Sequence, residues 1–290
     1  MSNQLHTPVM LKEVTKYLNP KPGKKYLDAT LGYGGHTLSL LEQGATVVGI
    51  DQDADMLELA YTRITESGFT NNFTPMHSSF ASALSGDRFA DHSFDGILFD
   101  LGASSYQFDT PQRGFSFRFD APLDMRMNKD LAVTARDLVN GLGKNELVNL
   151  FKTLGEEHAA TKIATAICER RKIKSIETTL KLAKLIERTI PKYGKIHPAT
   201  KVFQSLRMAV NSEREELKAA LPSALSKLTR GGVLAAISFH SLEEQIILEF
   251  FQNHLLAITL LTPSPLTPSS QEIISNARSR SAKLRVGEKI

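Results

Sequence analysis

The chain has 290 residues, of which 41% are hydrophobic and 23% are charged, and these globular proportions exclude wholesale disorder. No apolar run reaches the ~18 residues needed to cross a bilayer, and the first residues, MSNQLHTPVML, lack the basic and apolar blocks of a signal peptide. We therefore expect a cytoplasmic protein with no membrane partner. The single cysteine, Cys168, excludes a disulfide framework and zinc clusters built on cysteine pairs, and we expect no metal.

Charge is spread unevenly along the chain. Residues 1–128 carry a net charge of −5, residues 129–201 carry +7, residues 202–275 carry −2, and the last 15 residues carry +4. A basic middle and a basic tail on an acidic frame indicate a polyanionic partner that meets part of the surface. Solvated helix faces and an ordinary polar tail would give the same pattern, so charge alone leaves both interpretations open.

The first hundred residues alternate between strand-like and helix-like segments. Apolar, β-branched runs bounded by turn residues predict buried strands, and apolar residues at helical spacing predict helices between them. The predicted strands are Lys25–Ala29, Ala45–Ile50, Phe73–His77 and Asp95–Asp100, and the predicted helices are Thr37–Leu41 and Ala54–Thr65. A repeated strand–helix unit predicts an α/β fold with a parallel sheet and right-handed crossovers.

A large insertion follows the fourth strand. The next clear strand is Val233–Ser238, and a parallel crossover needs far fewer residues than the stretch that separates the two. That stretch is largely helical by pattern, over Lys144–Leu154, Glu156–Lys172, Thr178–Ile190 and Pro198–Val210, and two further strands are predicted at Ala257–Leu261 and Ser281–Val286. We predict a discontinuous domain of residues 1–110 and 200–290 that is interrupted by a helical domain of residues 111–199.

The stretch Asp28-Ala-Thr-Leu-Gly-Tyr-Gly-Gly-His36 joins the first strand to the first helix. Strand, glycine turn and helix together expose backbone N–H groups to a ligand. Gly32 and Gly34 fit the first two positions of the dinucleotide pattern G-x-G-x-x-G, but Thr37 occupies the third. A P-loop is excluded because no Gly-Lys-Ser/Thr follows.

Three acids stand at the ends of predicted strands: Asp28, Asp51 and Asp100. Ligands bind at the carboxyl edge of open parallel sheets, and a carboxylate after the second strand can accept both hydroxyls of a ribose. The set favours a ligand with a ribose and an ammonium group but no phosphates, such as S-adenosylmethionine. A nicotinamide or nucleotide site is the alternative, and Asp51 or Asp53 could simply cap the helix that begins near Ala54.

Several longer blocks then carry a resemblance that covers the chain from about His6 to Arg285. They are, in order, His6-Thr-Pro-Val9, the glycine turn from Asp28 to His36, Asp100-Leu-Gly-Ala-Ser-Ser105, Arg113-Gly-Phe-Ser-Phe117, Pro122-Leu-Asp-Met-Arg-Met127, Gly155-Glu-Glu157, His197-Pro-Ala-Thr200 and Ser238-Phe-His-Ser-Leu-Glu243. Together they closely resemble the bacterial 16S ribosomal RNA cytosine-N4 methyltransferases.

The resemblance implies a class I S-adenosylmethionine-dependent methyltransferase, Rossmann-like with a mostly parallel sheet, and an inserted all-helical domain. It implies methyl transfer to the exocyclic N4 amine of a decoding-region cytosine in 16S rRNA of the small ribosomal subunit. The residues that it assigns to the cofactor are Gly34, Gly35, His36, Asp51, Phe80, Asp100 and Gln107. The sequence departs from relatives at Tyr106, where proline is common, and between Phe251 and Arg278, where it is shorter than some.

The catalytic acceptor is not assigned by the sequence. A cytosine amine is a poor nucleophile, and an acceptor for its N–H would localise the nitrogen lone pair. DNA amino-methyltransferases commonly have Asp/Asn/Ser-Pro-Pro-Tyr where this chain has Asp100-Leu-Gly-Ala-Ser-Ser105, so Asp100 or a nearby main-chain carbonyl is the candidate. His240 suggests a general base, but Ser241 and Glu244 have capping-box spacing and favour a simple strand–helix turn.

Basic residues in two regions are candidate RNA contacts. The segment Arg113-Gly-Phe-Ser-Phe-Arg-Phe119 alternates aromatics as an RNA-recognition octamer does, although the same alternation could bury one face of a core strand. The candidates are Arg113, Arg118 and Arg126 in and after that segment, and Arg170, Arg171, Lys172, Lys174 and Lys195 in the insertion. Phosphate contacts would make binding salt-dependent, whereas a solvated helix end is the structural alternative for the second group.

Two other functions stay open at this stage. One is a methyltransferase that acts on other RNA or on protein, and the other is an RNA-binding or assembly factor that keeps the fold but has no activity. The complete set Gly34-Gly35-His36, Asp51 and Asp100 argues against the second. The partner is 16S rRNA or the small subunit, and the sequence fixes neither which of the two is the substrate nor the oligomeric state.

Overall fold

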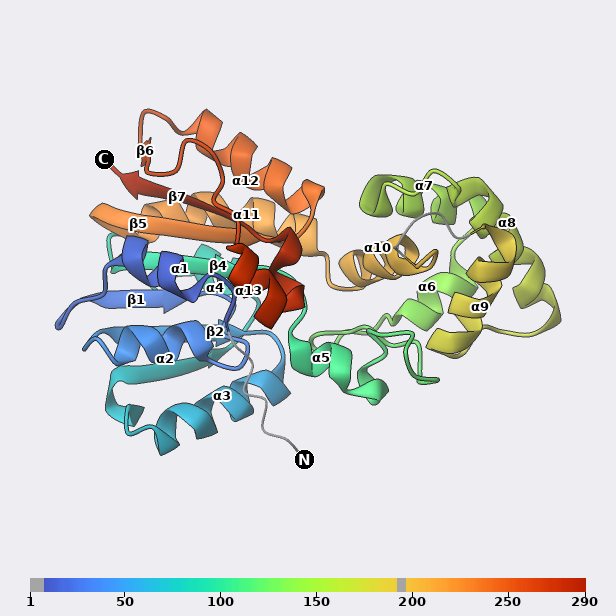
Figure 1. The fold of residues 1–290 in the computed structure, drawn as a ribbon, viewed down its shortest axis with the longest axis horizontal. Coiled ribbons are helices and arrows are strands. Elements are labelled where there is room, and N and C mark those ends of the chain that lie inside the picture. The colour runs from blue at the N-terminus through green and yellow to red at the C-terminus, as the bar shows by residue number, and fades with distance from the viewer. Residues whose placement is uncertain (1–7, 192–196) are drawn as a thin grey trace. The chain divides into compact units, whose positions relative to one another are not determined.

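The computed structural model describes residues 8–191 and 197–290, and the chain divides into two compact units. Unit 1 comprises residues 1–102 and 214–290, and unit 2 comprises residues 103–213. In Figure 1, unit 1 contains the blue to teal and the orange to red parts of the chain, and unit 2 contains the green to light-orange part, from α5 to α10.

Unit 2 is longer at both ends than the insertion of residues 111–199 that the sequence suggested. The C-terminal difference arises because α10 (Thr200–Val210) buries Val202 and Leu206 in the same core as Leu147 and Phe151 of α7 (Lys144–Gly155). Neither end carries a cluster of glycine and proline that would mark a boundary in the sequence.

Unit 1 is built on a seven-stranded sheet with the order β3-β2-β1-β4-β5-β7-β6. The strands are β1 (Lys25–Asp28), β2 (Thr46–Asp51), β3 (Phe73–His77), β4 (Phe94–Asp100), β5 (Leu228–Ser238), β6 (Ile258–Leu260) and β7 (Lys283–Lys289). Strands β1 to β5 pair in parallel, and β7 runs antiparallel to β5 and β6. The predicted mostly parallel α/β sheet is confirmed, and the carboxyl ends of β1 to β5 share one edge.

Helices cover both faces of this sheet (Figure 1). One face is covered by α1 (Leu11–Leu18), α2 (Gly35–Leu41) and α3 (Ala54–Glu66), and the other by α4 (Phe80–Ser85), α11 (Glu213–Lys227) and α12 (Ser241–Asn253). The remaining elements of unit 1 are the short helix α13 (Ser270–Ser275) and the 3-10 turns η1 (Thr70–Asn72) and η3 (Ala277–Ser281). This is the doubly covered arrangement that strands buried on both faces require.

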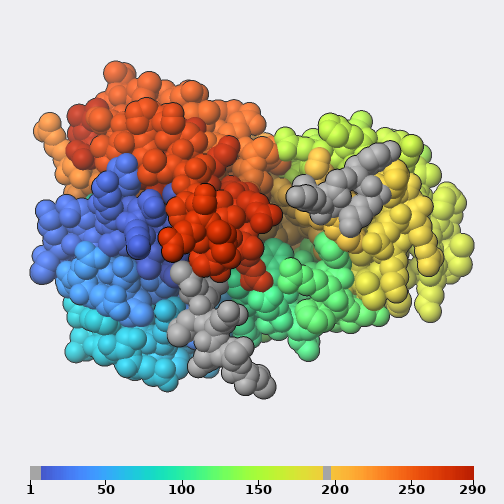
Figure 2. Space-filling view, viewed as in Figure 1, coloured from blue at the N-terminus to red at the C-terminus, as the bar shows by residue number. Residues whose placement is uncertain are grey.

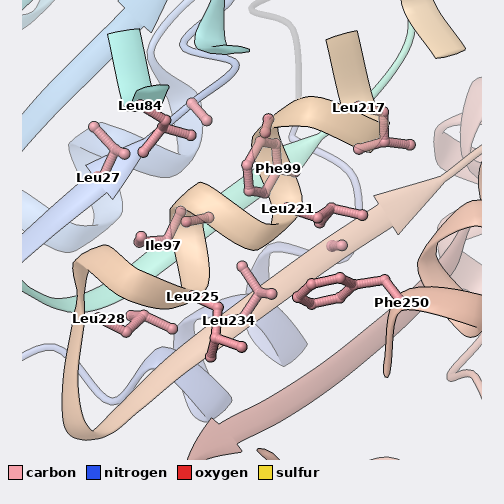
Figure 3. Close-up of a cluster of buried hydrophobic side chains, with 14 of the residues drawn as sticks. Leu27, Leu84, Ile97, Phe99, Leu217, Leu221, Leu225, Leu228, Leu234 and Phe250 are labelled. Carbon is pink, nitrogen blue, oxygen red and sulfur yellow. The ribbon is translucent and has the colours of Figure 1, made fainter. Parts of the chain in front are cut away.

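Figure 3 shows the core on one face of the sheet. Leu27, Ile97 and Phe99 project from the first and fourth strands toward Leu221 and Leu225 of α11. Complete burial of each such side chain contributes about 1.5–3 kcal/mol, so the strands beneath the carboxyl edge are held firmly.

Unit 2 is helical and has a core of its own. Its elements are α5 (Ser105–Asp109), η2 (Pro111–Arg113), α6 (Ala135–Gly141), α7, α8 (Ala160–Ile173), α9 (Thr179–Thr189) and α10. The prediction that α8 begins at Glu156 is wrong. Glu156 has a φ of 48° and ends α7 in the left-handed conformation, and the Glu157 carboxylate then accepts the Ala159 N–H at 2.8 Å, which delays the next helix to Ala160.

The C-terminal part of unit 1 packs back onto its N-terminal part. The Met10 backbone N–H donates a hydrogen bond of 2.7 Å to Glu272 of α13. Figure 2 shows α13 in red on the surface beside the blue N-terminal region. Across the two described stretches of chain, no helix is long and apolar enough to cross a membrane.

Candidate functional site

The glycine turn between β1 and α2 has the backbone conformation that its sequence predicts. Gly32 and Gly34 have φ values of 51° and 73°, in the left-handed region that favours glycine. A Cβ on Gly35 would lie 2.3 Å from the Pro8 Cγ, so no side chain fits there. The turn therefore presents its main chain, not side chains, at the carboxyl end of β1.

Asp51 holds this turn from the end of β2. Its carboxylate accepts the Gly32 N–H at 2.8 Å and the Asp53 N–H at 2.9 Å. Burial is the largest influence on this group and raises the pKa of Asp51 to about 7. Capping of α3 belongs to Asp53, whose side chain accepts the Asp55 N–H, so Asp51 is left at the sheet edge.

Asp28 is buried beneath the turn. Its carboxylate accepts the Thr37 hydroxyl at 2.8 Å and the Thr30 N–H at 3.2 Å, and burial raises the pKa of Asp28 while the nearby His36 lowers it. Asp28 thus ties the turn to the first turn of α2. Thr30 and Thr37 were not assigned roles from the sequence. Thr37 could have been noticed, because it occupies the third glycine position of the G-x-G-x-x-G pattern.

Asp100 and His36 meet where β4 ends beside the start of α2. The Asp100 N–H donates to the Thr30 hydroxyl at 2.6 Å, and the Asp100 Oδ2 lies 3.4 Å from the His36 Nε2. The Asp100 Oδ1 and both ring nitrogens of His36 are buried and have no hydrogen-bond partner among the described residues. Buried polar atoms left unsatisfied cost about 1–3 kcal/mol each, so these atoms are candidates for contact with a ligand.

Phe80 follows β3, the strand at the end of the sheet beside β2. It begins α4 directly after β3, is half-buried, and meets Phe99 in an edge-to-face contact with 5.5 Å between ring centroids. Of the seven predicted cofactor residues, six lie at or just after the carboxyl ends of neighbouring strands within unit 1. These six are Gly34, Gly35, His36, Asp51, Phe80 and Asp100.

Gln107, the seventh predicted residue, belongs to unit 2. It is buried in α5, where its side-chain carbonyl accepts the Ser104 N–H at 2.9 Å and its backbone N–H donates to the Ser104 hydroxyl. This capping box gives Gln107 a local structural role.

His240 caps α12 and lies one residue earlier than the predicted cap at Ser241. Its Nδ1 accepts the Glu243 N–H at 3.3 Å, and the Glu243 carboxylate accepts the Phe239 N–H at 2.7 Å. Glu244, the predicted partner of Ser241, instead bonds Arg285. The strand–helix turn that the sequence favoured over a general base is thus present, but its cap is formed by His240 and Glu243 and not by Ser241 and Glu244.

Three of the arginines considered for RNA contact are used inside unit 2. Arg113 is only 6% exposed and donates to the Arg126 and Met127 carbonyls. Arg126 bonds Asp124 at 2.8 Å and donates to two backbone carbonyls. Arg171 donates to the carbonyls of Val139 and Leu142. These guanidiniums close loops, so they are poor candidates for meeting phosphates.

The other candidates are more accessible. Arg118, Lys172 and Lys174 are exposed, and Arg170 is half-buried near the end of α8. Lys172 pairs with Glu169 at 2.8 Å, with both side chains largely in solvent. Lys195 lies outside the described residues.

Comparison with known sequences gives one consistent family. The sequence model of the MraW methylase family matches residues 3–290. A protein of Cyanothece sp. (strain PCC 7425 / ATCC 29141), the ribosomal RNA small subunit methyltransferase H, is 45% identical over 289 residues that cover 99% of this chain and 95% of that protein. The protein of the same name from Pelobacter propionicus is 41% identical, and the match covers 100% of both chains.

Comparison with solved structures supports the same fold. A "putative rRNA-methylase" from Clostridium thermocellum aligns over 99% of this chain and 100% of its own, with a TM-score of 0.50 and 14% identity. A "putative methyltransferase" from Streptococcus mutans, solved in complex with SAH, aligns over 98% and 100% with a TM-score of 0.50 and 11% identity. The fold of unit 1 is the Rossmann-like fold of class I methyltransferases.

Proposed function

Because the chain belongs to the MraW methylase family, we propose that it methylates small-subunit ribosomal RNA, at the exocyclic N4 amine of a decoding-region cytosine in 16S rRNA. The observation that carries this proposal is the set of polar groups at the carboxyl edge of the sheet. Asp51, His36 and Asp100 lie around the glycine turn, and His36 and Asp100 have three buried atoms with no hydrogen-bond partner in the described part of the chain.

These residues fit S-adenosylmethionine. The Asp51 carboxylate suits the two ribose hydroxyls, and the ring of Phe80 suits stacking on adenine. The unsatisfied Asp100 oxygen suits an N–H donor, which the methionine ammonium or the cytosine amine would supply. A nicotinamide or nucleotide with a diphosphate fits poorly, because its negative charge would meet Asp28, Asp51 and Asp100 without a facing lysine or arginine in the turn.

The bound cofactor supplies an electrophilic methyl group on a sulfonium. The chain's own contribution is mainly to position the reactants, since displacement requires the amine nitrogen and the methyl carbon in line at about 3–3.5 Å. Asp100, or a main-chain carbonyl near it, accepts the N–H of the amine and localises its lone pair. No residue is assigned as a general base.

Unit 2 is the proposed RNA-binding domain. Residues 103–213 contain nineteen Lys/Arg against twelve Asp/Glu, whereas the rest of the chain is net negative. Exposed basic side chains on it, such as Lys174, would release counterions from the RNA backbone on binding. A partner of this kind would be met in the cytoplasm, with the ribosome.

A mass analysis of nucleosides from 16S rRNA tests the reaction. Cells that lack this chain should lose one N4-methylated cytidine, and cells that express Asp51→Ala should lose it as well. The purified chain should restore it on small subunits or on free 16S rRNA, which distinguishes the two substrates. An unchanged methylcytidine profile would exclude the reaction, and methylation of another RNA or of a protein would favour the alternative methyltransferase.

A further inference from the structure

A pocket of about 300 Å³ lies beside the turn after β5, apart from the glycine turn and the acids. All of its lining residues belong to unit 1. They come from three segments of the chain: Phe239, His240 and Ser241 precede or begin α12, residues 280–283 span the end of η3 and the start of β7, and Thr267 lies before α13. Antiparallel pairing of Ser238 with Lys283 brings the first two segments together.

The pocket is basic. Arg280 and Lys283 are exposed, and no carboxylate pairs with either of them within residues 8–191 and 197–290. Among the described residues, no acidic side chain lines the pocket. The two buried carboxylates beside it are already engaged. Glu243 accepts the Phe239 N–H at 2.7 Å and lies 3.1 Å from the His240 Nε2, and Glu244 is bound by Arg285 at 2.8 Å and by Ser238 at 3.0 Å. Two free cations therefore face a concave surface that also carries hydroxyl groups.

The pocket shares the carboxyl edge of the sheet with the proposed methylation site. Asp100 of β4 is in register with Ile237 of β5, and Phe239 follows two residues later. A Cβ on Gly102 would lie 3.6 Å from the Phe239 ring, so the chain leaving β4 passes directly beside this ring. Adjacent strands are about 4.8 Å apart, which places the pocket one strand farther along the edge than Asp100.

We propose that this pocket binds a nucleotide of the RNA strand next to the target cytosine, with the phosphate on Arg280 and Lys283. The inference rests on the proposed function, because the strand must cross the edge at which Asp100 receives its base. The rings of Phe239 and His240 line the pocket and suit stacking of a base or packing of a ribose, which single-stranded RNA exposes. A volume of 300 Å³ exceeds what a lone phosphate needs, and a lining of rings together with cations matches the chemistry of a nucleotide.

Arg280→Gln/Lys283→Gln tests the assignment in the full-length chain. The matched control is Lys21→Gln/Arg230→Gln, which removes two exposed cations of unit 1, one before β1 and one near the start of β5, away from the carboxyl edge. Binding of a 16S rRNA fragment containing the target is measured over a range of salt concentrations. We expect the pocket variant to bind about tenfold more weakly at low salt, with a log–log salt slope that is shallower by about 0.7 for one lost phosphate contact on a single strand. The control should match the wild type in both.

Two further measurements separate the possible outcomes. S-adenosylmethionine affinity and the thermal midpoint should be unchanged in the pocket variant, and photocrosslinking of 4-thiouridine beside the target cytosine should label a peptide that contains Phe239 or Lys283. Equal RNA affinity and salt slope in the pocket variant and the wild type would overturn the pocket assignment alone. Loss of affinity for the assembled subunit with normal binding of naked RNA would overturn it in favour of an acidic ribosomal protein. If the wild-type chain binds RNA but transfers no methyl group, the proposed function is wrong, while the comparison of RNA binding between the variants still tests the pocket.

Discussion

Arg285 of β7 donates from its Nε to the Glu244 Oε1 of α12 at 2.8 Å, and its Nη2 lies 2.8 Å from the same oxygen. Both side chains are at least about nine-tenths buried. The second oxygen of Glu244 accepts the Ser238 hydroxyl at 3.0 Å, so the carboxylate joins two strands and a helix. This pair lies under the β5–α12 turn and supports the walls of the basic pocket.

Removal of one partner from this pair should destabilise unit 1 strongly. We expect Arg285→Met to lower the free energy of unfolding by about 3–5 kcal/mol, because it leaves the Glu244 carboxylate buried and uncompensated. The double variant Glu244→Gln/Arg285→Met should recover part of the loss. Urea unfolding measures both, and a loss under 1 kcal/mol in the single variant would contradict a structural role for the pair.

Asp100 should affect cofactor binding and turnover together. We predict that Asp100→Ala weakens S-adenosylmethionine binding and abolishes methyl transfer, because it removes the carboxylate whose Oδ1 is buried and has no hydrogen-bond partner within residues 8–191 and 197–290. Calorimetry gives the affinity, and single-turnover assays at saturating cofactor give the rate. Asp87→Ala, a change at an exposed acid after α4, is the matched control. Normal affinity with an unchanged rate in Asp100→Ala would remove this residue from the mechanism.

The pKa of Asp51 gives cofactor binding a pH dependence. Since burial raises the pKa of this carboxyl from 3.8 to about 7, the folded protein keeps it protonated to a higher pH than the unfolded chain does. The ionised form is the better acceptor of ribose hydroxyls, so affinity for S-adenosylmethionine should fall as the pH drops below about 7, approaching tenfold per pH unit. Calorimetry from pH 5.5 to 7.5 should show this slope in the wild type and a flatter profile in Asp51→Asn.

The same shift acts on stability in the opposite sense. Protons are bound preferentially by the folded state between about pH 4 and 7, so the contribution of Asp51 to the free energy of unfolding falls as the pH rises through that window. Asp51→Asn should remove that part of the decline. A stability difference between the two proteins that does not vary with pH would show that Asp51 titrates normally.

Arg171 and Lys174, two basic residues near the end of α8, should have different roles. Arg171→Ala should destabilise the protein by about 1–3 kcal/mol, because the carbonyls of Val139 and Leu142 lose a charged donor. Lys174→Ala should leave stability unchanged and weaken RNA binding in a salt-dependent way, since its side chain is exposed. Thermal unfolding and RNA titration separate the two effects, and equal stability of both variants would contradict the role given to Arg171.

The parallel strands were predictable because burial on both faces leaves unbroken apolar runs. Residues 46–50 and 95–99 are nearly all apolar, and the structure places their strands within one or two residues of the predicted ends. The direction of β7 was not predictable, since alternation along a strand does not tell which neighbour it joins. The start of β5 at Leu228 was missed because Gly231 and Gly232 interrupt its apolar pattern.

The residues of the candidate site also divide into those that the sequence predicts and those that it does not. The glycine turn, Asp51 and Asp100 follow from strand ends, which sequence patterns locate well. The roles of Arg113 and Arg126 could not be predicted. Only tertiary contacts distinguish a guanidinium that bonds backbone carbonyls from one that faces solvent, and the sequence does not reveal these contacts. The cap at His240 was misplaced by one residue for a related reason. Serine is the commoner N-cap, and only the backbone geometry shows that the imidazole accepts the Glu243 N–H.

The chain leaves the sheet after β4 and returns to it only with β5, with the whole of unit 2 made in between. On a translating ribosome, the first four strands therefore emerge with the edge of β4 unpaired until α11 and β5 follow. An open edge of this kind can pair with another nascent chain, and non-local strand pairing is slow. Rapid local folding of the helical segment would shorten the interval of exposure, so mutations that slow it should raise aggregation during synthesis even where the finished protein is stable.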